Sequence, residues 1–163
     1  MPPRDDRRPL TLPELLASVG ARRSAGERAV LTNGCFDLLH VGHLRALEDG
    51  ATRGDYLIVC INDDASVRSS KGEGRPVFPA AERAELLLGL RAVDLVHVFS
   101  GETVDDVLRA VRPEVYAKGR DYTPDSIPEA PTVRAYGGEI VIVGDPKDHS
   151  TREILRSIHT KGT

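Results

Sequence analysis

Short apolar segments alternate with amphipathic patterns along the chain. Each apolar segment is bounded by Gly, Asp, Asn or Pro and is short for a helix, which is typical of a strand buried on both faces. These segments cover residues 29–32, 56–61, 95–99, 115–117 and 139–143. The pattern therefore predicts buried strands of the kind found in a parallel sheet.

Helical patterns lie before and between the predicted strands. A short amphipathic helix begins near Thr11, which has capping-box spacing to Glu14. Later helical patterns cover about residues 43–53, 79–91, 103–111 and 150–159. This alternation predicts an α/β fold with a doubly wound parallel sheet and right-handed crossovers. Ligands bind beyond the carboxyl ends of the strands in such a sheet, so the loops that follow the strands are expected to hold the chemistry.

Length and composition fit one domain. The chain has 163 residues, of which 40% are hydrophobic and 29% are charged, enough for a core and a charged exterior. We expect a disordered lead at residues 1–9, rich in Pro and Arg, and a single domain over residues 10–163. No window approaches the roughly 18 apolar residues of a transmembrane helix, and the lead lacks the apolar stretch of a signal peptide. A cytoplasmic protein without a membrane partner is expected.

Charge and cysteine content narrow the function further. The chain carries 22 Lys and Arg against 25 Asp and Glu, a net charge of −3, which offers no general attraction for nucleic acid or anionic lipid. Any recognition of phosphate must therefore be local. Cys35 and Cys60 are the two cysteines, each within an apolar run, so neither a disulfide framework nor a Cys-based metal site is expected.

The turn from the first strand into the next helix, residues 32–43, holds the most informative pattern. His40 and His43 lie three apart, and Gly42 precedes the second. Free N–H groups at a helix start favour an anion, and a glycine lets phosphate oxygens approach the backbone. The histidines are either ligands of such an anion or ordinary polar residues of a helix start. A zinc site is less well supported, because it needs three or four ligands and no further His or Cys completes the set.

The pattern G-x-F-D-x-x-H-x-G-H, which begins at Gly34, resembles the signature of the nucleotidyltransferase superfamily. That superfamily includes cytidylyltransferases and the heptose-1-phosphate adenylyltransferases. The resemblance implies a Rossmann-like nucleotidyltransferase fold in which His40 and His43 contact the triphosphate and stabilise its charge in the transition state. It also implies that the backbone approaches the nucleotide at Cys35 and Phe36.

Residues 71–76, KGEGRP, form a cationic and glycine-rich segment after the second strand. Composition alone leaves open a solvated surface loop or a mobile loop that folds over a phosphate. The adenylyltransferase branch has a similar Lys-Gly-x-x-Arg-Pro-Val stretch. The resemblance implies that Lys71 is a catalytic cation and that Arg75 contacts the acceptor substrate.

Arg83 lies early in the helical pattern from residue 79. It belongs either to the exposed side of that helix or, because the family often has an arginine here, to the sugar-phosphate site.

Lys118-Gly-Arg-Asp-Tyr122 follows the fourth predicted strand directly. The segment is a charged turn at a strand end or part of a sugar-nucleotide site, and it resembles the Lys-Gly-x-Asp-Tyr segment of the heptose-phosphate enzymes. That resemblance implies that Lys118 and Gly119 contact the nucleotide and that Asp121 and Tyr122 contact the sugar.

Ser150, Thr151 and Arg152 begin the last predicted helix, where either hydroxyl suits an N-cap. The superfamily places a Ser-Thr-Thr-like triplet there to hold the nucleotide's phosphates. Arg152 replaces the second threonine, and its guanidinium suits a charge-assisted bond to phosphate. Residues 145–149 differ from the Arg-Thr-Glu-Gly-Ile of many cytidylyltransferases, which favours the adenylyltransferase branch.

The resemblance extends from about Val30 to Ile158 and implies transfer of AMP from ATP, with Mg²⁺, to a sugar 1-phosphate such as D-glycero-manno-heptose 1-phosphate. It also implies a homo-oligomer, dimeric or larger. Two alternatives stay open: a cytidylyltransferase for glycerol 3-phosphate or another polyol phosphate, and a non-catalytic nucleotide-binding regulatory module. Hydrolase triads, a P-loop and a dinucleotide-binding glycine motif are missing from the sequence, which disfavours those chemistries.

Overall fold

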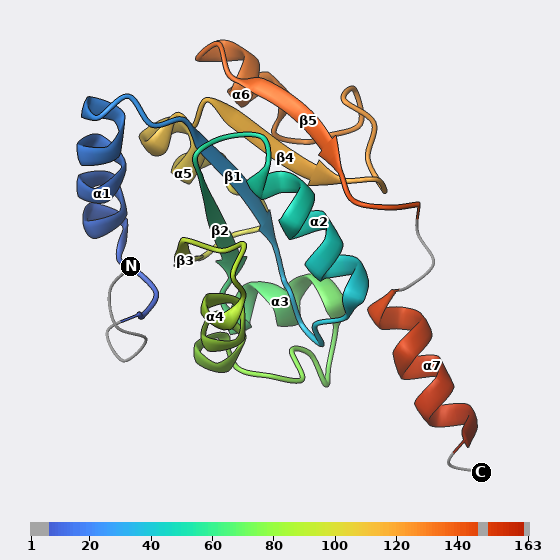
Figure 1. Cartoon of the computed structure of the whole chain (residues 1–163). Coiled ribbons are helices and arrows are strands. Elements are labelled where there is room, and N and C mark those ends of the chain that lie inside the picture. The colour runs from blue at the N-terminus through green and yellow to red at the C-terminus, as the bar shows by residue number, and fades with distance from the viewer. Residues whose placement is uncertain (1–6, 147–149, 162–163) are drawn as a thin grey trace.

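A parallel five-stranded sheet forms the centre of the molecule (Figure 1). The computed structural model describes residues 7–146 and 150–161. The strands are β1 (Ala29–Gly34), β2 (Tyr56–Asn62), β3 (Leu95–Phe99), β4 (Val115–Gly119) and β5 (Glu139–Val143). All neighbouring pairs are parallel, in the order β3-β2-β1-β4-β5. The structure confirms each strand predicted from the apolar pattern and the predicted fold class.

Helices precede the sheet and connect its strands. They are α1 (Leu12–Ser24), α2 (Val41–Ala51), α3 (Asp64–Lys71), α4 (Ala80–Gly89), α5 (Asp105–Val111), α6 (Ala130–Ala135) and α7 (Thr151–Lys161). The sequence pattern missed α3 and α6. Val67 is the only buried residue of α3, and α6 has six residues, so neither produces an apolar stripe that recurs over several turns. Within the described parts of the chain, no helix has the length and apolar character to cross a membrane.

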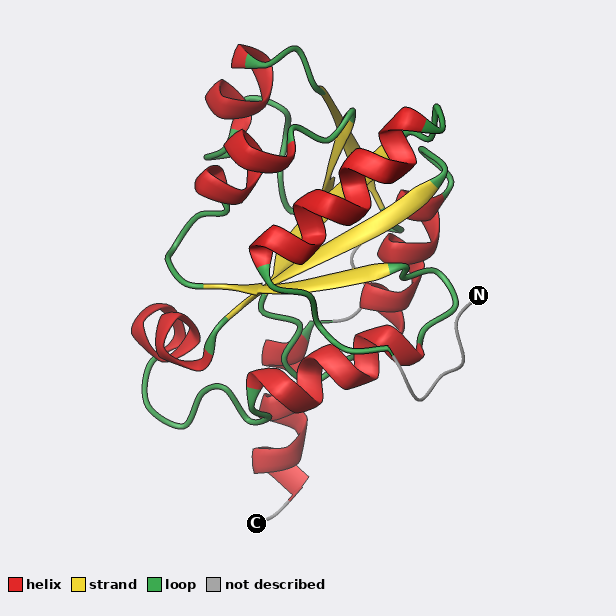
Figure 2. Ribbon diagram, turned by 90° about the vertical axis from the view of Figure 1, so that its left-hand side faces the viewer, coloured by secondary structure: helices red, strands yellow, loops and turns green. Residues whose placement is uncertain are grey.

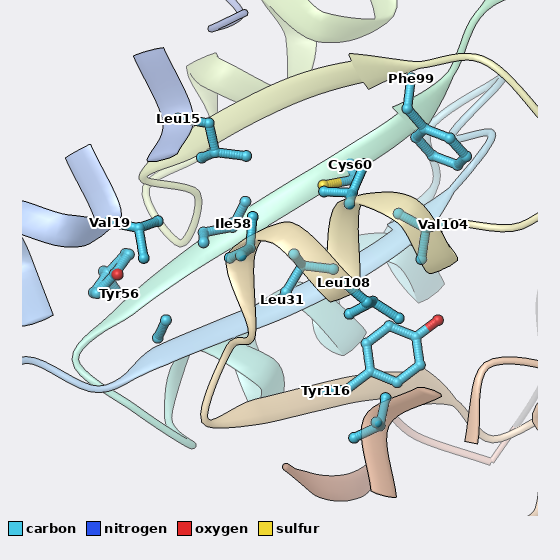
Figure 3. Packing of buried hydrophobic residues seen from close by; sticks show 14 of the residues in the cluster. Leu15, Val19, Leu31, Tyr56, Ile58, Cys60, Phe99, Val104, Leu108 and Tyr116 are labelled. Atoms are coloured by element: carbon cyan, nitrogen blue, oxygen red, sulfur yellow. The ribbon is translucent and has the colours of Figure 1, made fainter. Parts of the chain in front are cut away.

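The two faces of the sheet pack against different helices (Figure 2). Successive strand residues point to opposite faces, so Leu31 joins the core under α1, α5 and α6, whereas its neighbour Val30 joins the core under α2 and α4. Figure 3 shows the first of these cores, in which Leu15 from α1 lies on the side of Ile58 of β2 and Leu108 from α5 lies beside the Tyr116 ring of β4. Both faces are covered, which explains why the strands are almost uniformly apolar.

The strand order reverses beside β1, because the chain moves outward through β2 and β3 and then returns to form β4 and β5 on the other side. In an open α/β sheet the crevice beyond the carboxyl ends of the two strands at such a reversal is the usual ligand site. Here that crevice lies at the ends of β1 and β4, next to the start of α2.

The chain before α1 is attached to the edge strand β3. Leu10 pairs with His97 through a parallel bridge, and the Arg7 guanidinium donates a hydrogen bond to the Val93 carbonyl. Residues 7–9, which we expected to belong to a disordered lead, therefore lie against the sheet; residues 1–6 of that lead fall outside the described residues. The predicted capping box is present, with the Thr11 N–H donating to the Glu14 carboxylate at 2.8 Å.

Candidate active site

An open cavity of about 860 Å³ lies at the carboxyl ends of β1 and β4. It has a size typical of small-molecule sites. Residues 35–43, which we call the β1–α2 wall, form one side, and the end of α3, the start of α7, residues 118–122 and Glu129 are among the other segments that line it. Every site residue predicted from the sequence lines this cavity except Arg83.

His40 and His43 form a stacked pair at the start of α2. Their ring centroids are 3.9 Å apart with an angle of 26° between the planes. His40 is the N-cap: its Nδ1 accepts the Gly42 N–H at 3.1 Å, and the Nδ1 of His43 accepts the His40 N–H at 3.4 Å. Because each Nδ1 is an acceptor, the neutral rings carry their proton on Nε2. Both histidines therefore act through Nδ1 as polar residues of the helix start.

The backbone before this pair is held in an unusual conformation. Phe36 and Leu38 have φ values of 49° and 56°, in the left-handed region that side chains other than glycine rarely adopt. The Phe36 ring packs against His43 with centroids 5.3 Å apart. It also lies so close to Gly34 that a Cβ there would be 3.1 Å from the ring. Strain of this kind persists only where the surroundings hold it, and it is common at functional sites.

Asp37 supplies much of that support. Its carboxylate is 2% exposed and accepts hydrogen bonds from Arg75 Nε at 2.7 Å, the Val77 N–H at 2.8 Å and the Phe78 N–H at 3.1 Å. Burial by itself would raise the pKa of Asp37, but these hydrogen bonds and the Arg75 charge more than offset it, so the pKa lies below its ordinary value. Asp37 thus fastens the loop after α3 to the β1–α2 wall, and its carbonyl accepts the Thr151 hydroxyl of α7 at 3.2 Å.

Arg83 does not reach the cavity. Its side chain has no exposed surface, which contradicts both expectations for it, an exposed helix side and contact with sugar phosphate. The guanidinium donates to the carbonyls of Phe78, Cys35 and Asn62 at 2.7 to 2.9 Å and to the Asp64 carboxylate at 2.8 Å. Arg83 therefore ties the ends of β1 and β2 to the loop before α4, and it supports the site from behind.

Lys71, Arg75 and Arg152 are among the cationic residues that line the cavity, and they come from separate segments of the chain. Lys71 is the exposed last residue of α3, so the flexible loop predicted from residue 71 begins one residue later, at Gly72. Arg75 is held by Asp37 through Nε. Arg152 is exposed in the first turn of α7.

The sequence offers Ser150 and Thr151 as N-cap candidates for α7, and the structure shows Ser150 in that role. Its Oγ accepts the Glu153 N–H at 3.1 Å. The other candidate, Thr151, donates instead to the Asp37 carbonyl. Both hydroxyls line the cavity at the point where the last helix meets the β1–α2 wall.

Lys118, at the end of β4, is 7% exposed. Its Nζ donates to Asn33 Oδ1 at 3.0 Å, lies 3.8 Å from Glu129 Oε2 and stands 4.9 Å from the centroid of the Tyr122 ring. Burial lowers the pKa of Lys118, and the negative charge of Glu129 opposes that shift in part. Gly119 and the exposed Asp121 follow it along the cavity.

Two residues beside Lys118 were not predicted. Asn33 accepts the Tyr116 hydroxyl at 2.6 Å as well as the Lys118 ammonium, and Glu129 is 3% exposed just before α6. We call Asn33, Tyr116, Lys118 and Glu129 the Lys118–Glu129 cluster. Asn33 could have been found as a polar residue at the end of a buried strand. Glu129 lies outside every motif, and nothing in the local sequence marks it.

The site offers no ready-made metal cage. In the described ranges, no three His, Cys, Asp or Glu side chains gather closely enough to hold an ion. Cys60 is fully buried in the core, which raises the pKa of its thiol, and Cys35 is partly exposed in the β1–α2 wall. Imidazoles, cations and the Lys118–Glu129 cluster are among the groups that line the cavity.

Comparison with known proteins adds independent information. Residues 31–160 match the family described as cytidylyltransferase-like. The protein named bifunctional protein HldE from Alkalilimnicola ehrlichii is 53% identical over 134 residues, which are 82% of this chain and 28% of that protein. The protein of the same name from Pseudomonas aeruginosa is 45% identical over 153 residues, 94% of this chain and 32% of that protein. The chain thus spans about a third of the length of these relatives.

Solved structures show the same fold. The lipopolysaccharide core biosynthesis protein from Thermoplasma volcanium superposes with a TM-score of 0.64 at 25% identity, over 75% of this chain and 100% of that one. Pantothenate synthetase from Thermus thermophilus superposes with a TM-score of 0.67 at 18% identity, over 96% of this chain and 70% of that one. The second likeness concerns the fold alone.

Proposed function

This chain belongs to the cytidylyltransferase-like family, as the motif in its first strand-to-helix turn predicted, and we propose that it transfers AMP from ATP to a sugar 1-phosphate. The products are an ADP-sugar and pyrophosphate. The observation that carries the proposal is the stacked histidine pair at the start of α2, in one cavity with Lys71, Arg152 and Lys118. The likeness of residues 118–122 to the heptose-phosphate enzymes, together with the HldE relatives, supports D-glycero-manno-heptose 1-phosphate as the acceptor.

The reaction needs positioning and charge stabilisation more than proton transfer. A phosphate oxygen of the acceptor is already ionised at neutral pH, and it forms a bond to the α-phosphorus while the bond from that phosphorus to the pyrophosphate oxygen breaks. The attacking and leaving oxygens lie roughly in line during this exchange. The catalyst must align two polyanions and stabilise the charge that grows on the leaving group. A cavity lined by donors and cations, without a strong base, suits this task.

The β1–α2 wall is the proposed seat of the triphosphate. Free backbone N–H groups and the dipole at the start of α2 attract anionic oxygen. With Nδ1 of each ring occupied by a backbone N–H, His40 and His43 donate through Nε2–H to oxygens of the α-phosphate and the leaving pyrophosphate. Their positions are set before the substrate binds, so little reorganisation accompanies the reaction.

The cations are proposed to close around the phosphates from the other elements. Lys71 and Arg152 are exposed and carry long flexible side chains that can follow the charge as it moves to the leaving group. The Nε atom of Arg75 is bound to Asp37, so its two terminal nitrogens are available for the acceptor. Ser150 and Thr151 place hydroxyl groups at the same edge.

Mg²⁺ is expected to enter with ATP. In many nucleotide sites Mg²⁺ is held by phosphate oxygens and water rather than by a protein cage. This agrees with the described residues, among which no three acidic, imidazole or thiol side chains gather to hold an ion. When bound, the ion neutralises charge on the phosphates. His40, His43 and Lys71 then orient the same oxygens from the protein side.

Pyrophosphate release over a grid of the four nucleoside triphosphates and a panel of phosphorylated sugars and polyols, with Mg²⁺, tests the proposal. We expect turnover with ATP and a heptose 1-phosphate. Turnover with CTP and glycerol 3-phosphate would instead identify a cytidylyltransferase. Binding of intact ATP with no turnover across the panel would identify a regulatory module, for which the replacement of a threonine by Arg152 is the one sequence feature in favour.

A further inference from the structure

Glu129 is a buried carboxylate that opens onto the cavity. Its side chain is 3% exposed and lines the cavity wall. Among the residues that the structure describes, none donates a hydrogen bond to its Oε2 atom. The Lys118 ammonium lies 3.8 Å from that atom, close enough for an ion pair and too far for a hydrogen bond. A buried acceptor without a donor is costly, and most such atoms in proteins are satisfied by a partner.

The neighbouring donors make their short hydrogen bonds to a different acceptor. The Tyr116 hydroxyl and the Lys118 ammonium both donate to Asn33 Oδ1, at 2.6 and 3.0 Å. The main chain of Glu129 is fixed by α6, since its carbonyl accepts the Val133 N–H at 3.1 Å. The carboxylate is therefore placed next to a positive charge, and its Oε2 atom has no donor among the described residues.

We propose that Glu129 determines acceptor specificity by accepting hydrogen bonds, through Oε2, from hydroxyl groups of the acceptor sugar. This assignment rests on the proposed transfer to a sugar 1-phosphate. A negative carboxylate repels phosphate groups, so the part of a substrate that it contacts is uncharged and rich in donors. A sugar ring with neighbouring hydroxyls has that character.

The position of Glu129 distinguishes the acceptor from the nucleotide. Tyr116 belongs to the core under α1, α5 and α6, and Lys118, two residues later, points to the same face of β4. The histidine pair stands at α2, which packs on the opposite face. If pyrophosphate leaves on the α2 side, an in-line attack brings the acceptor from the side of α5 and α6. The Lys118–Glu129 cluster lies on that side.

The experiment compares the full chain with Glu129→Gln, which keeps the shape of the side chain and removes its charge. Initial rates of pyrophosphate release give KM for the sugar 1-phosphate and for ATP separately. We expect KM for the sugar 1-phosphate to rise about ten- to hundredfold, the range for a hydrogen bond to a charged group, with KM for ATP changed less than about twofold. Asp125→Asn is the matched control, because Asp125 lies on the same segment with a 93% exposed side chain.

Acceptor analogues that lack single hydroxyl groups sharpen the test. Removing the hydroxyl that Glu129 binds should raise KM for the acceptor in the wild-type enzyme and raise it less in Glu129→Gln, because the neutral amide of that variant accepts a weaker hydrogen bond than a carboxylate does. Thermal unfolding checks that the variant is folded. If it is not, Glu129→Asp, which retains the charge on a shorter side chain, should still raise KM for the acceptor alone.

The outcomes separate this inference from the proposed function. A rise in KM for ATP instead of the acceptor would place Glu129 on the nucleotide, and unchanged constants in a folded variant would make it structural; either result overturns the inference while the transfer reaction stands. If the wild-type enzyme turns over no sugar phosphate at all, both the inference about Glu129 and the proposed function are overturned.

Discussion

The β1–α2 wall and the Lys118–Glu129 cluster lie at the same edge of the sheet, yet they are assembled in different ways. The wall is one continuous stretch, residues 35–43, in which each histidine accepts a backbone N–H from a residue two or three positions away in the same turn. The cluster brings Asn33 from β1 together with Lys118 from β4 and Glu129 from the loop before α6. Its members meet only because the chain folds.

This difference shows which part of the site can be encoded in a short sequence motif and which part depends on the tertiary fold. Nucleotidyl transfer is the same reaction for any phosphate acceptor, and a local turn with a helix N-terminus can bind the triphosphate within a short motif. Recognition of one acceptor requires side chains placed around its particular shape, and those can come from any element that reaches the cavity. We propose that the wall accounts for the reaction class and that the cluster accounts for the acceptor.

The strongest way to break the comparison is to remove a histidine from the wall. His43→Ala should lower kcat about 10²- to 10³-fold, since it deletes a fixed donor to charge that develops in the transition state. The melting temperature should change little. Val41→Ala, at an exposed position of the same helix start, is the control for kinetics and stability. A folded His43→Ala enzyme with near-normal turnover contradicts the role.

The next largest effect concerns the support behind the wall. Arg83→Lys replaces a buried guanidinium that serves four acceptor groups with one ammonium group, and it leaves buried oxygens without donors. We expect the free energy of unfolding to fall by about 3 kcal/mol, measured by urea denaturation. Arg91→Lys, on the exposed surface after α4, should change it by less than about 0.5 kcal/mol. Equal stability of the two variants would show that Arg83 is not the clamp described.

A smaller effect is expected at Lys71, where a substitution should change the binding of ATP and leave the stability of the fold unchanged. Lys71→Ala should reduce kcat/KM for ATP about ten- to hundredfold through the loss of a charge-assisted bond to phosphate, and it should leave the melting temperature unchanged because the side chain is exposed. Arg68→Ala removes another exposed cation from the same helix, one that does not line the cavity. Similar losses in both variants would point to a general effect of charge instead of a contact by Lys71.

The smallest effect is a dependence on pH. The pKa of Asp37 is lower in the folded protein than its ordinary value, so its contribution to stability is complete above the ordinary pKa and is lost as the pH falls through the folded value. Asp37→Asn should cost about 1 to 2 kcal/mol at pH 7. The difference in the free energy of unfolding between Asp37→Asn and the wild type should become smaller below about pH 4.

Urea denaturation at a series of pH values measures this narrowing. Asp106→Asn, at a fully exposed position, is the control and should follow the wild type. A constant difference between Asp37→Asn and the wild type across the acid range would show that the ionised carboxylate is not what holds the loop.

Much of the fold could be predicted because the strands of a parallel sheet are buried on both faces and stand out as apolar runs. Apolar patterning did not predict α3, because Val67 is its one buried residue. It also did not predict the burial of Arg83, because an arginine on a helix is usually exposed. Local sequence does not show that four oxygens from separate parts of the chain converge on that guanidinium.

The candidate site divides in the same way. His40, His43 and Lys118 could be placed at the sheet edge from the sequence, since each follows a predicted strand or opens a helix, and the structure brings them into one cavity. Asp37 was visible in the motif, but its part in holding Arg75 depends on a contact across 38 positions of the chain. Glu129 has no local signal, and its proximity to Lys118 is a product of the crossover between β4 and β5.

The central claim is that the β1–α2 wall binds the triphosphate and the Lys118–Glu129 cluster binds the acceptor. A crystal structure of the protein with Mg²⁺, a nonhydrolysable ATP analogue and the sugar 1-phosphate tests it most directly. The account predicts the triphosphate against the Nε2 atoms of His40 and His43, with the sugar hydroxyls within hydrogen-bond distance of Glu129 Oε2. Phosphates bound elsewhere, a metal ion between the two imidazole rings, or the adenine in the place assigned to the sugar would contradict it.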